Sequence, residues 1–501
     1  SQPDDDSDLP CSPSSEFCDG SLAMLCDDEG LTAIVVEDCF PDRVCWAGAC
    51  RDPCDVAADR HSYLGCDFLA VSTLNSGLGA GFATDFAVVV GAPIDGGDAH
   101  IEVSRQGTVV ASRTVPAGTS DAITLPMVTE LQQAGGSLFA NASSATVPGG
   151  AYEVHSDVPV VAYQFNPLHF STSALAWSYT NDASLLLPEH ALTGTYRVQT
   201  WSTWEYSPFV QYRGFVAVAA TEDGTSVTIT SSAWTASGDP AALPPGGSTT
   251  VLLDRGDVVQ VLSGSSADDD LSGTSISASA PVMTFMGHDC TYVPLEQPAC
   301  DHLEEVAFPV ETWGALVPIS ALRHPDGSGL STARYRIQGR TGGVGLTFEP
   351  AVHAPATLAE GELLDFDSDQ DFVVTATGQI QVTQTMFGQD ALQATSGGDP
   401  AMGTGIPWTQ TRASYDFLVP TTYTANWLNL VAPADTVVLL DGAPVAGWSP
   451  IGVSGYDAAR VAVNPGSHRV LSEDGATFAI TAYGYAQYTS YLYPAGLNLL
   501  R

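Results

Sequence analysis

Two short runs in the middle of the chain combine the residue types that bind transition metals. They read His288-Asp289-Cys290 and Cys300-Asp301-His302, close to a mirror image of each other. Cysteines this near in sequence can be joined across a short loop, so we expect Cys290 and Cys300 to be paired. Closing that loop would bring two imidazoles and two carboxylates together, and these groups are metal ligands. A buried His–Asp hydrogen bond at a domain junction needs no metal, and we favour that alternative.

A second candidate cation site is a run of alternating aspartates, Asp365, Asp367, Asp369 and Asp371. Carboxylates at every second position share one face of a strand or fold around a cation in a loop, where repulsion between like charges makes an empty cluster unfavourable. Calcium is therefore the one cofactor that the sequence suggests. The run lacks the glycine and the distal glutamate of an EF-hand loop, so this would be a different type of site. Asp268-Asp269-Asp270 is a weaker candidate, and solvated acids in turns explain both runs without calcium.

Aromatic residues offer a third kind of site. Trp201, Trp204 and Tyr206 lie close together in sequence and could form a platform for a sugar ring or a partner protein. Tyrosines also crowd the end of the chain, at Tyr483, Tyr485, Tyr488, Tyr491 and Tyr493. Aromatic side chains on one face of a sheet more often pack across strands, so we favour packing over ligand binding.

The sequence lacks the motifs of the common enzyme classes. It contains no G-x-S-x-G elbow, no H-E-x-x-H, no P-loop and no G-x-G-x-x-G after a strand. The ten histidines are scattered along the chain. We therefore predict no catalytic residues and a protein that is not an enzyme. The remaining alternative is an extracellular hydrolase whose Ser, His and Asp come from distant segments.

Eight of the ten cysteines fall within the first 66 residues, among Gly, Asp and Pro. This segment has too few apolar residues for a core of its own, so disulfides must supply its stability. Zinc is the competing interpretation, but the spacings lack paired CxxC knuckles. Disulfides indicate an oxidising compartment, which makes the protein extracellular or displayed on the outer cell surface. The eight positions, whose pairing the sequence leaves open, are Cys11, Cys18, Cys26, Cys39, Cys45, Cys50, Cys54 and Cys66.

Charge excludes two classes of partner. The chain has 57 acidic residues against 16 basic ones, all arginine, and a net charge of -41. Nucleic acids and anionic membranes select Lys or Arg clusters, which this sequence lacks. No apolar run reaches the roughly 18 residues of a membrane span. Because Ser1 does not begin a signal peptide, we expect a mature form that was exported by a signal peptide outside this chain.

The elements that must position these residues are mostly strands. Runs rich in Val, Thr and Ala, such as 215–220, 227–230 and 372–375, alternate with Gly, Asp and Pro turns. Helical periodicity is nearly absent, with one short helix expected over Met127–Ala134. This alternation predicts an all-β protein with tandem β-sandwiches in a row after the disulfide-rich module.

An internal repeat sets the expected domain boundaries. Leu187-Pro188, Phe308-Pro309 and Val419-Pro420 each precede a strand-like stretch, at intervals of 121 and 111 residues. A hydrophobic strand closes each unit, within 156–163, 279–285, 377–384 and 476–483. We therefore expect a flexible acidic leader at 1–10, a disulfide-rich module at 11–66, and β-sandwiches at 67–184, 185–303, 304–414 and 415–501.

One stretch also resembles a known family. Cys300-Asp301-His302 leads through Phe308-Pro309 to Trp313-Gly314, a "C…CDH…P…WG" signature that resembles the IgGFc-binding protein N-terminal domain family. Asn181 to Pro188 is similar to the "SDA…LP" segment of the same family, and the resemblance covers about residues 60–415. It implies that Asp301, His302, Pro309, Trp313 and Gly314 are motif residues. It carries no Fc contact onto any residue here.

These observations favour a non-catalytic structural or adhesion protein. Its β-domain edges and loops would bind a protein or glycan on a surface or in extracellular matrix, or copies of itself. The apolar segment from Tyr491 to Leu500 is the expected place of self-association. The alternative is a multi-domain carbohydrate-binding module that uses the aromatic platform.

Overall fold

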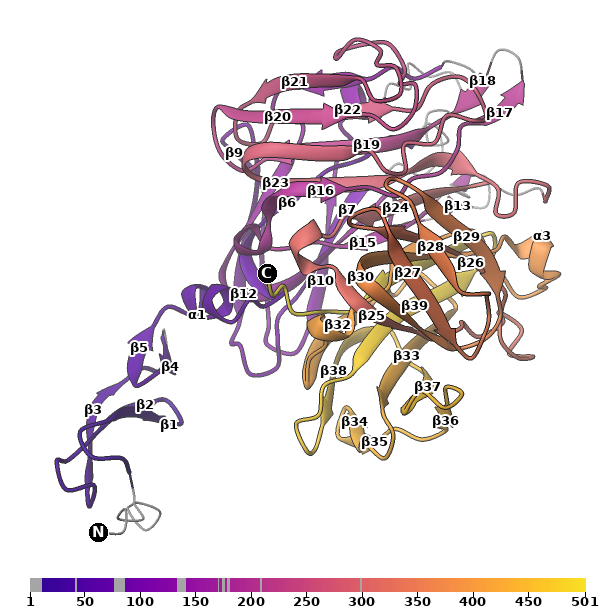
Figure 1. The fold of residues 1–501 in the computed structure, drawn as a ribbon. Coiled ribbons are helices and arrows are strands. Elements are labelled where there is room, and N and C mark those ends of the chain that lie inside the picture. The colour runs from indigo at the N-terminus through magenta and orange to yellow at the C-terminus, as the bar shows by residue number, and fades with distance from the viewer. Residues whose placement is uncertain are drawn as a thin grey trace.

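The computed structural model confirms an all-β fold preceded by a disulfide-rich stretch (Figure 1). The residues that it describes are 11–40, 43–75, 86–132, 141–169, 171–173, 176–177, 181–207, 210–297 and 300–501. The expected leader therefore lies outside the described residues. In place of the helix expected over Met127–Ala134 there is a single turn, α2 (Thr129–Gln132), and residues 133 and 134 lie outside the described part.

The N-terminal module projects away from the body of the molecule (Figure 1). Its four disulfides join Cys11 to Cys26, Cys18 to Cys45, Cys39 to Cys50, and Cys54 to Cys66. They tie together small elements that bury few side chains, as expected for a segment without an apolar core. These elements are a three-stranded sheet of β1 (Glu16–Asp19), β2 (Leu22–Cys26) and β3 (Ala33–Asp38), the hairpin of β4 (Val44–Trp46) and β5 (Ala49–Arg51), and α1 (Pro53–Asp59).

The first sheet of the body is seven-stranded and antiparallel, with β10-β7-β12-β8-β9 as its main path. Its strands are β6 (Gly65–Ala70), β7 (Phe86–Gly91), β8 (Ala99–Arg105), β9 (Thr108–Val115), β10 (Ser120–Leu125), β12 (Tyr152–Phe165) and β15 (Ala183–Leu185). A separate small pair consists of β13 (Ser171–Ser173) and β14 (Ala176–Trp177).

The second sheet is eight-stranded, and its strand β11 comes from before residue 184 and pairs with β22. The strands are β11 (Ala145–Val147), β16 (Thr193–Arg197), β19 (Gly214–Ala220), β20 (Thr225–Thr230), β21 (Ser248–Leu253), β22 (Val258–Leu262), β23 (Ser275–Thr291) and β24 (Asp301–Val306). A hairpin of β17 (Trp204–Ser207) and β18 (Val210–Tyr212) stands beside it.

The third sheet has seven strands, followed by the short helix α3 (Gln389–Leu392) after β30. Its strands are β25 (Gly314–Ile319), β26 (Ala333–Gly339), β27 (Val344–Glu349), β28 (Ala356–Leu358), β29 (Leu363–Ser368), β30 (Phe372–Met386) and β31 (Met402–Thr404).

Two smaller sheets form the C-terminal unit. One contains β32 (Ser414–Val419), β34 (Val438–Leu440), β35 (Ala443–Pro444) and β38 (Gly466–Ser472). The other contains β33 (Ala425–Pro433), β36 (Ser449–Pro450), β37 (Tyr456–Ala462), β39 (Ala479–Ala486) and β40 (Thr489–Pro494).

The repeat is built as a proline, a 3-10 turn and a strand. Pro188 precedes η3 (Glu189–Ala191), and Pro309 precedes η4 (Val310–Thr312). The third copy is Pro407 before η5 (Trp408–Gln410), which then leads into β32. Val419-Pro420, the third copy expected from the sequence, does precede a strand, since β33 begins at Ala425, but no 3-10 turn lies between them.

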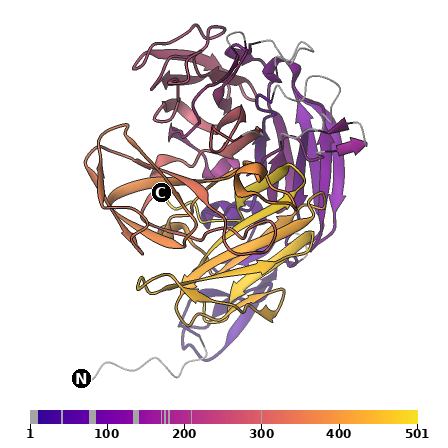
Figure 2. The ribbon, with the colours of Figure 1, turned by 90° about the vertical axis from the view of Figure 1, so that its right-hand side faces the viewer.

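The last unit packs against the first (Figure 2). One continuous apolar core contains side chains of β7, β12, β32 and β40. Within it the rings of Tyr163 and Tyr493 lie 4.5 Å apart, and Ser62 forms a bridge with Asn498. Tyr491, Leu497 and Leu499 are buried in the same core. The expectation that this segment docks onto a neighbouring molecule is therefore wrong, because it fills the core of its own chain.

Candidate functional site

The cysteine clip closes at the end of a long strand. A disulfide of 2.03 Å joins Cys290 to Cys300, at the end of β23 and just before β24. The two strands pair antiparallel, with His288 opposite Leu303 and an irregularity before Asp301. The clip therefore holds the end of β23 against the start of β24, where the Asp301-His302 pair begins.

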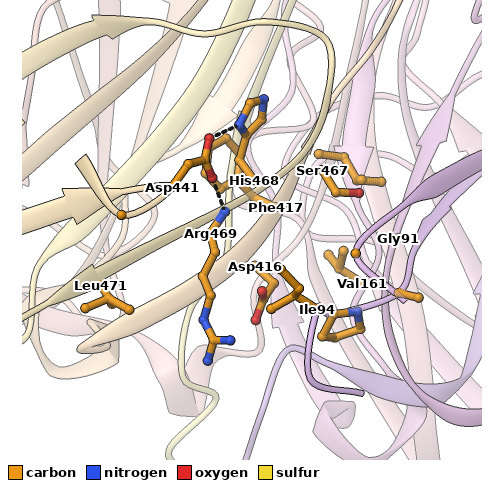
Figure 3. Close-up of a pocket in the computed structure, with 15 residues that line it drawn as sticks. Gly91, Ile94, Val161, Asp416, Phe417, Asp441, Ser467, His468, Arg469 and Leu471 are labelled. Atoms are coloured by element: carbon orange, nitrogen blue, oxygen red, sulfur yellow. Dashed lines mark hydrogen bonds and ion pairs between the residues drawn. The ribbon is translucent and has the colours of Figure 1, made fainter. Parts of the chain in front are cut away.

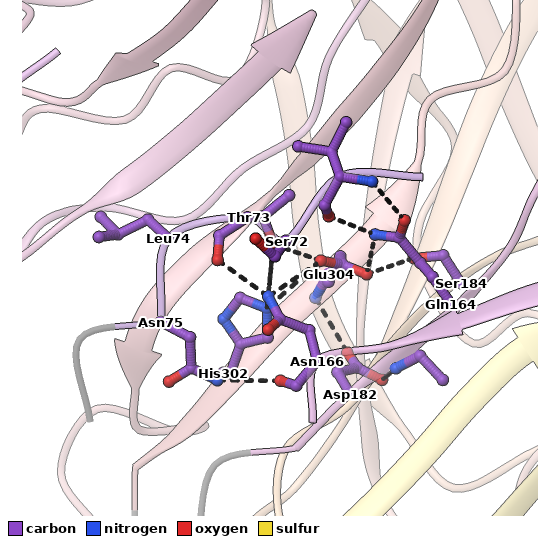
Figure 4. Close-up of polar contacts among 12 residues, drawn as sticks. Ser72, Thr73, Leu74, Asn75, Gln164, Asn166, Asp182, Ser184, His302 and Glu304 are labelled. Atoms are coloured by element: carbon purple, nitrogen blue, oxygen red, sulfur yellow. Dashed lines mark hydrogen bonds and ion pairs between the residues drawn. The ribbon is translucent and has the colours of Figure 1, made fainter. Parts of the chain in front are cut away.

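His302 is fully buried and lies in a polar network (Figure 4). Its ring stacks on that of Phe215, with centroids 5.7 Å apart. Its Nε2 lies 3.4 Å from the Thr73 hydroxyl, 3.4 Å from Nδ2 of Asn166 and 3.6 Å from the Glu304 carboxylate. The groups around His302 therefore come from three segments that are distant in sequence, at Thr73, Asn166 and Phe215.

The two motifs quoted from the sequence meet at this place. Asp182 accepts hydrogen bonds of 3.0 Å from the backbone N–H groups of Glu304 and Met402. Ser184 and Gln164 donate to Oε1 of Glu304, at 3.1 and 2.7 Å. These contacts join β12, β15, β24 and β31 at one polar junction between sheets (Figure 4). The motif residues are therefore placed where a structural role needs them, and Glu304 is a central member that sequence reasoning missed.

Four carboxyl groups at this junction have strongly raised pKa values. Burial is the largest cause in each case, and it raises the pKa of Asp182, Asp301, Glu305 and Asp399 well above the usual range. The negative charges of Asp399 and Asp182 add to the effect on Asp301. A buried carboxyl without a cation nearby favours its neutral form. These groups are therefore protonated at pH values where a surface aspartate is charged.

The possible metal ligands do not converge. His288 accepts a hydrogen bond of 3.1 Å at Nδ1 from the Cys290 backbone, and burial lowers its pKa to about 3. Asp289 is buried nearby. Within the described part of the chain, no group of three or more His, Cys, Asp or Glu side chains is arranged to hold a metal ion.

The remaining motif residues shape the corner that enters the third sheet. Pro309 accepts hydrogen bonds at its carbonyl from Thr312, and the buried Trp313 donates through Nε1 to the Phe308 carbonyl at 3.2 Å. Gly314 begins β25, where an added Cβ would lie 2.7 Å from the Cβ of Pro407. Glycine is needed there because two repeat corners touch.

The alternating aspartates lie opposite arginines. On the paired strands β29 and β26, Asp367 faces Arg334 and Asp365 faces Arg336, and both pairs are ion pairs. Asp371 pairs with Arg460, and Asp369 is exposed. Arg336 also binds Asp270 at 2.8 Å, which accounts for part of the second acidic run. The arginines on the neighbouring strand reduce the repulsion among these carboxylates. A bound cation would have the same effect in a cluster without arginines.

The three residues of the expected platform separate into two environments. Trp201 is 5% exposed and lies under the Arg336 guanidinium, 4.8 Å from its ring centroid. Trp204 instead stacks on Tyr212 at 5.2 Å, on the β17–β18 hairpin. The rings of Tyr206 and Tyr292 lie 5.4 and 4.2 Å from that of Trp204. Because Tyr292 lies in the loop that the Cys290–Cys300 disulfide closes, the cluster of Trp204, Tyr206, Tyr212 and Tyr292 adjoins the clip. Tyr206 is 56% exposed.

The most apolar exposed strand is β3 of the N-terminal module. Ile34, Val35 and Val36 are 61%, 53% and 60% exposed, so both faces of the strand meet solvent. β3 pairs with β2 on one side, and no other described strand pairs with it. An apolar edge of this kind is a template for adding a strand from another chain. Sequence reasoning missed this edge, although Ala33–Val36 is an apolar run, because the number of strands paired with β3 depends on the fold.

Comparisons with known proteins give one informative match. A family profile described as IgGFc binding protein matches residues 182–484, more than half of the chain. Two solved structures cover 82% and 80% of this chain and 97% of their own lengths, at 8% and 7% identity and TM-scores of 0.11 and 0.13. They are an anti-sigma factor domain-containing protein from Clostridium clariflavum and another anti-sigma factor domain-containing protein. Scores this low carry no argument, and no curated protein matches the chain.

Proposed function

This chain belongs to the IgGFc-binding protein family, and from that membership we propose that it is a structural or adhesion protein of a cell surface or extracellular matrix. The family is one of extracellular, non-enzymatic binding proteins. Five disulfides agree with an oxidising compartment. Among the described residues, no helix is both long and apolar enough to cross a membrane.

The exposed edge of β3 is the observation that carries this proposal. A neighbouring protein strand can bond to the free backbone groups of β3, while its side chains cover Ile34 and Val36. The module projects from the body, so a partner can reach this edge without disturbing the main sheets (Figure 1). The partner is either a second copy of this chain or another protein, with immunoglobulin Fc as the candidate that the family description names.

Substitution of one exposed aliphatic residue tests the edge. Ile34→Asp places a charge on β3 and should weaken association about tenfold or more, because charged residues on edges block strand addition. Association is measured by light scattering over a concentration series for self-assembly, and by interferometry on immobilised IgG Fc. Val453→Asp is the control, since Val453 is 89% exposed in a loop of the C-terminal unit. Association that survives Ile34→Asp unchanged would contradict strand addition at β3.

A second candidate function is glycan binding at the aromatic cluster around Trp204. Its supporting observation is that Trp204 and Tyr206 lie together with Tyr212 and Tyr292 at a partly exposed face. Stacked aromatic faces suit sugar rings. Tyr206→Ala and Trp204→Ala should then abolish binding on a broad polysaccharide panel, whereas Trp234→Ala should leave it intact because Trp234 is exposed elsewhere. A panel without any binding would remove this candidate.

A further inference from the structure

A cavity separates the first sheet from the C-terminal unit (Figure 3). Its volume is about 400 Å³, which lies within the range of small-molecule sites. The end of β7 and strand β12 form one wall, and β32 and β38 form the other. Gly91 lets the walls approach at one end, since a Cβ there would lie 2.7 Å from Leu418.

The walls of the cavity are largely apolar. Ile94 and Val161 line it from the first sheet, and Leu418 and Leu471 line it from the C-terminal unit. On the paired strands, Leu418 lies opposite Ser467. Such a lining favours a ligand with an apolar body, because burying that body removes apolar surface from water.

Most charged groups around the cavity already have partners. Asp441 accepts hydrogen bonds from Nδ1 of His468 at 2.7 Å and from the Arg469 backbone at 2.9 Å. The Arg469 guanidinium pairs with Asp95, on the loop that follows Ile94. This pair connects the two walls and occupies the one arginine that lines the cavity.

Asp416 is the exception. It lies opposite Arg469 on the paired strands β32 and β38 and lines the cavity (Figure 3). Its backbone is hydrogen-bonded to Tyr63, but no described group forms a hydrogen bond with its carboxyl oxygens. Burial raises the pKa of this carboxyl, and the Arg469 charge offsets the effect only in part. A half-buried acid thus lines a largely apolar cavity, and no described protein group is hydrogen-bonded to its carboxyl oxygens.

From this arrangement we propose that the cavity binds a small organic amine, with its ammonium group on the Asp416 carboxylate and its apolar body between Val161 and Leu471. An ammonium supplies both the missing hydrogen-bond donors and the opposite charge. No side chain of the chain itself provides an ammonium, because the sequence has no lysine. An anionic ligand would instead meet Asp416 and Asp441 together.

Two matched probes test the chemical class. 4-Phenylbutylamine and 4-phenylbutyrate share an apolar body and differ in the sign of their charge. We expect the amine to bind the full chain at least about tenfold more tightly than the acid, measured by calorimetry at about 0.15 M salt to screen the overall charge of the protein. Equal affinity for the two probes, or no binding of the amine, would overturn the proposal.

Three variants locate the site. Asp416→Asn should remove the preference for the amine and keep the fold, because the lost carboxyl makes no hydrogen bond with any residue that the structure describes. Leu471→Trp should fill the cavity and weaken both probes. Asp369→Asn is the control, since it removes one exposed negative charge outside the cavity. A preference for the amine that survives Asp416→Asn, or that Asp369→Asn removes equally, would show that overall charge attracts the amine and would refute the site.

Discussion

At the scale of single residues, the unusual feature is the number of buried carboxyl groups. Asp182, Asp301, Glu304, Glu305 and Asp399 are all buried where sheets meet. Backbone N–H groups bind Asp182 and Glu305, and side chains bind Glu304. Burying polar groups is costly unless they are hydrogen-bonded, so this junction depends on its partners being in place. The same burial raises the pKa of Asp182, Asp301, Glu305 and Asp399.

The raised pKa values predict how stability depends on pH. Between the ordinary carboxyl pKa near 4 and the raised folded values, the folded state holds more protons than the unfolded state. The free energy of unfolding should therefore decrease as pH rises through this window, by about 1.4 kcal/mol per pH unit for each extra proton held. Stability should be greater in mild acid than at neutral pH, as measured by denaturant unfolding at several pH values.

One substitution separates this effect from the overall negative charge. Asp399→Asn removes a single buried acid, so it should flatten the dependence of stability on pH. The exposed Asp369→Asn should leave that dependence nearly unchanged. A slope that is identical in the two variants would mean that charge repulsion across the surface, and not the buried junction, sets the pH dependence.

At the scale of elements, three long strands each serve more than one set of partners. β12, β23 and β30 have 14, 17 and 15 residues. In β23 the first part pairs with β20 and the later part with β19 and β24. Pro159, Pro281 and Gly378 lie within these strands, near the change of partners. Proline cannot donate to a ladder and glycine weakens one, so such residues suit the place where a strand leaves one set of partners for another.

At the scale of the whole molecule, the chain closes on itself. Arg501 donates to the carbonyls of His190 and Leu192, and Asn498 forms a bridge with Ser62. The end of the chain is thus part of the core around the first sheet. The disulfide-rich module, in contrast, lies outside that core and projects from it (Figure 1).

Two truncations should therefore differ strongly in their effect on stability. Removing residues 488–501 deletes β40 and its buried tyrosines, and it should abolish cooperative unfolding, because each large buried side chain contributes several kcal/mol, roughly 3–5. Removing residues 1–51 deletes three complete disulfides and should leave the melting temperature of the body within a few degrees. Differential scanning calorimetry of both variants measures this. A body that survives loss of β40 would contradict the shared core.

The fold class, the family and the oxidising compartment could be predicted from local sequence. Strand patterning repeats along the chain, cysteine content reflects the compartment, and the motif from Cys300 to Gly314 is local, so each can be detected without knowing which segments meet. The strands expected at 156–163, 279–285, 377–384 and 476–483 overlap β12, β23, β30 and β39, whereas nothing in the sequence indicated the 3-10 corner at Pro407.

The surroundings of the candidate residues depend on the tertiary structure. It placed arginines opposite Asp365 and Asp367, buried Trp201 beneath Arg336 and put the C-terminal segment inside the core. It also created the cavity beside Asp416 from segments more than 300 residues apart. The physical reason is that burial, pairing and charge balance depend on contacts between distant strands, and local sequence does not specify which strands become neighbours.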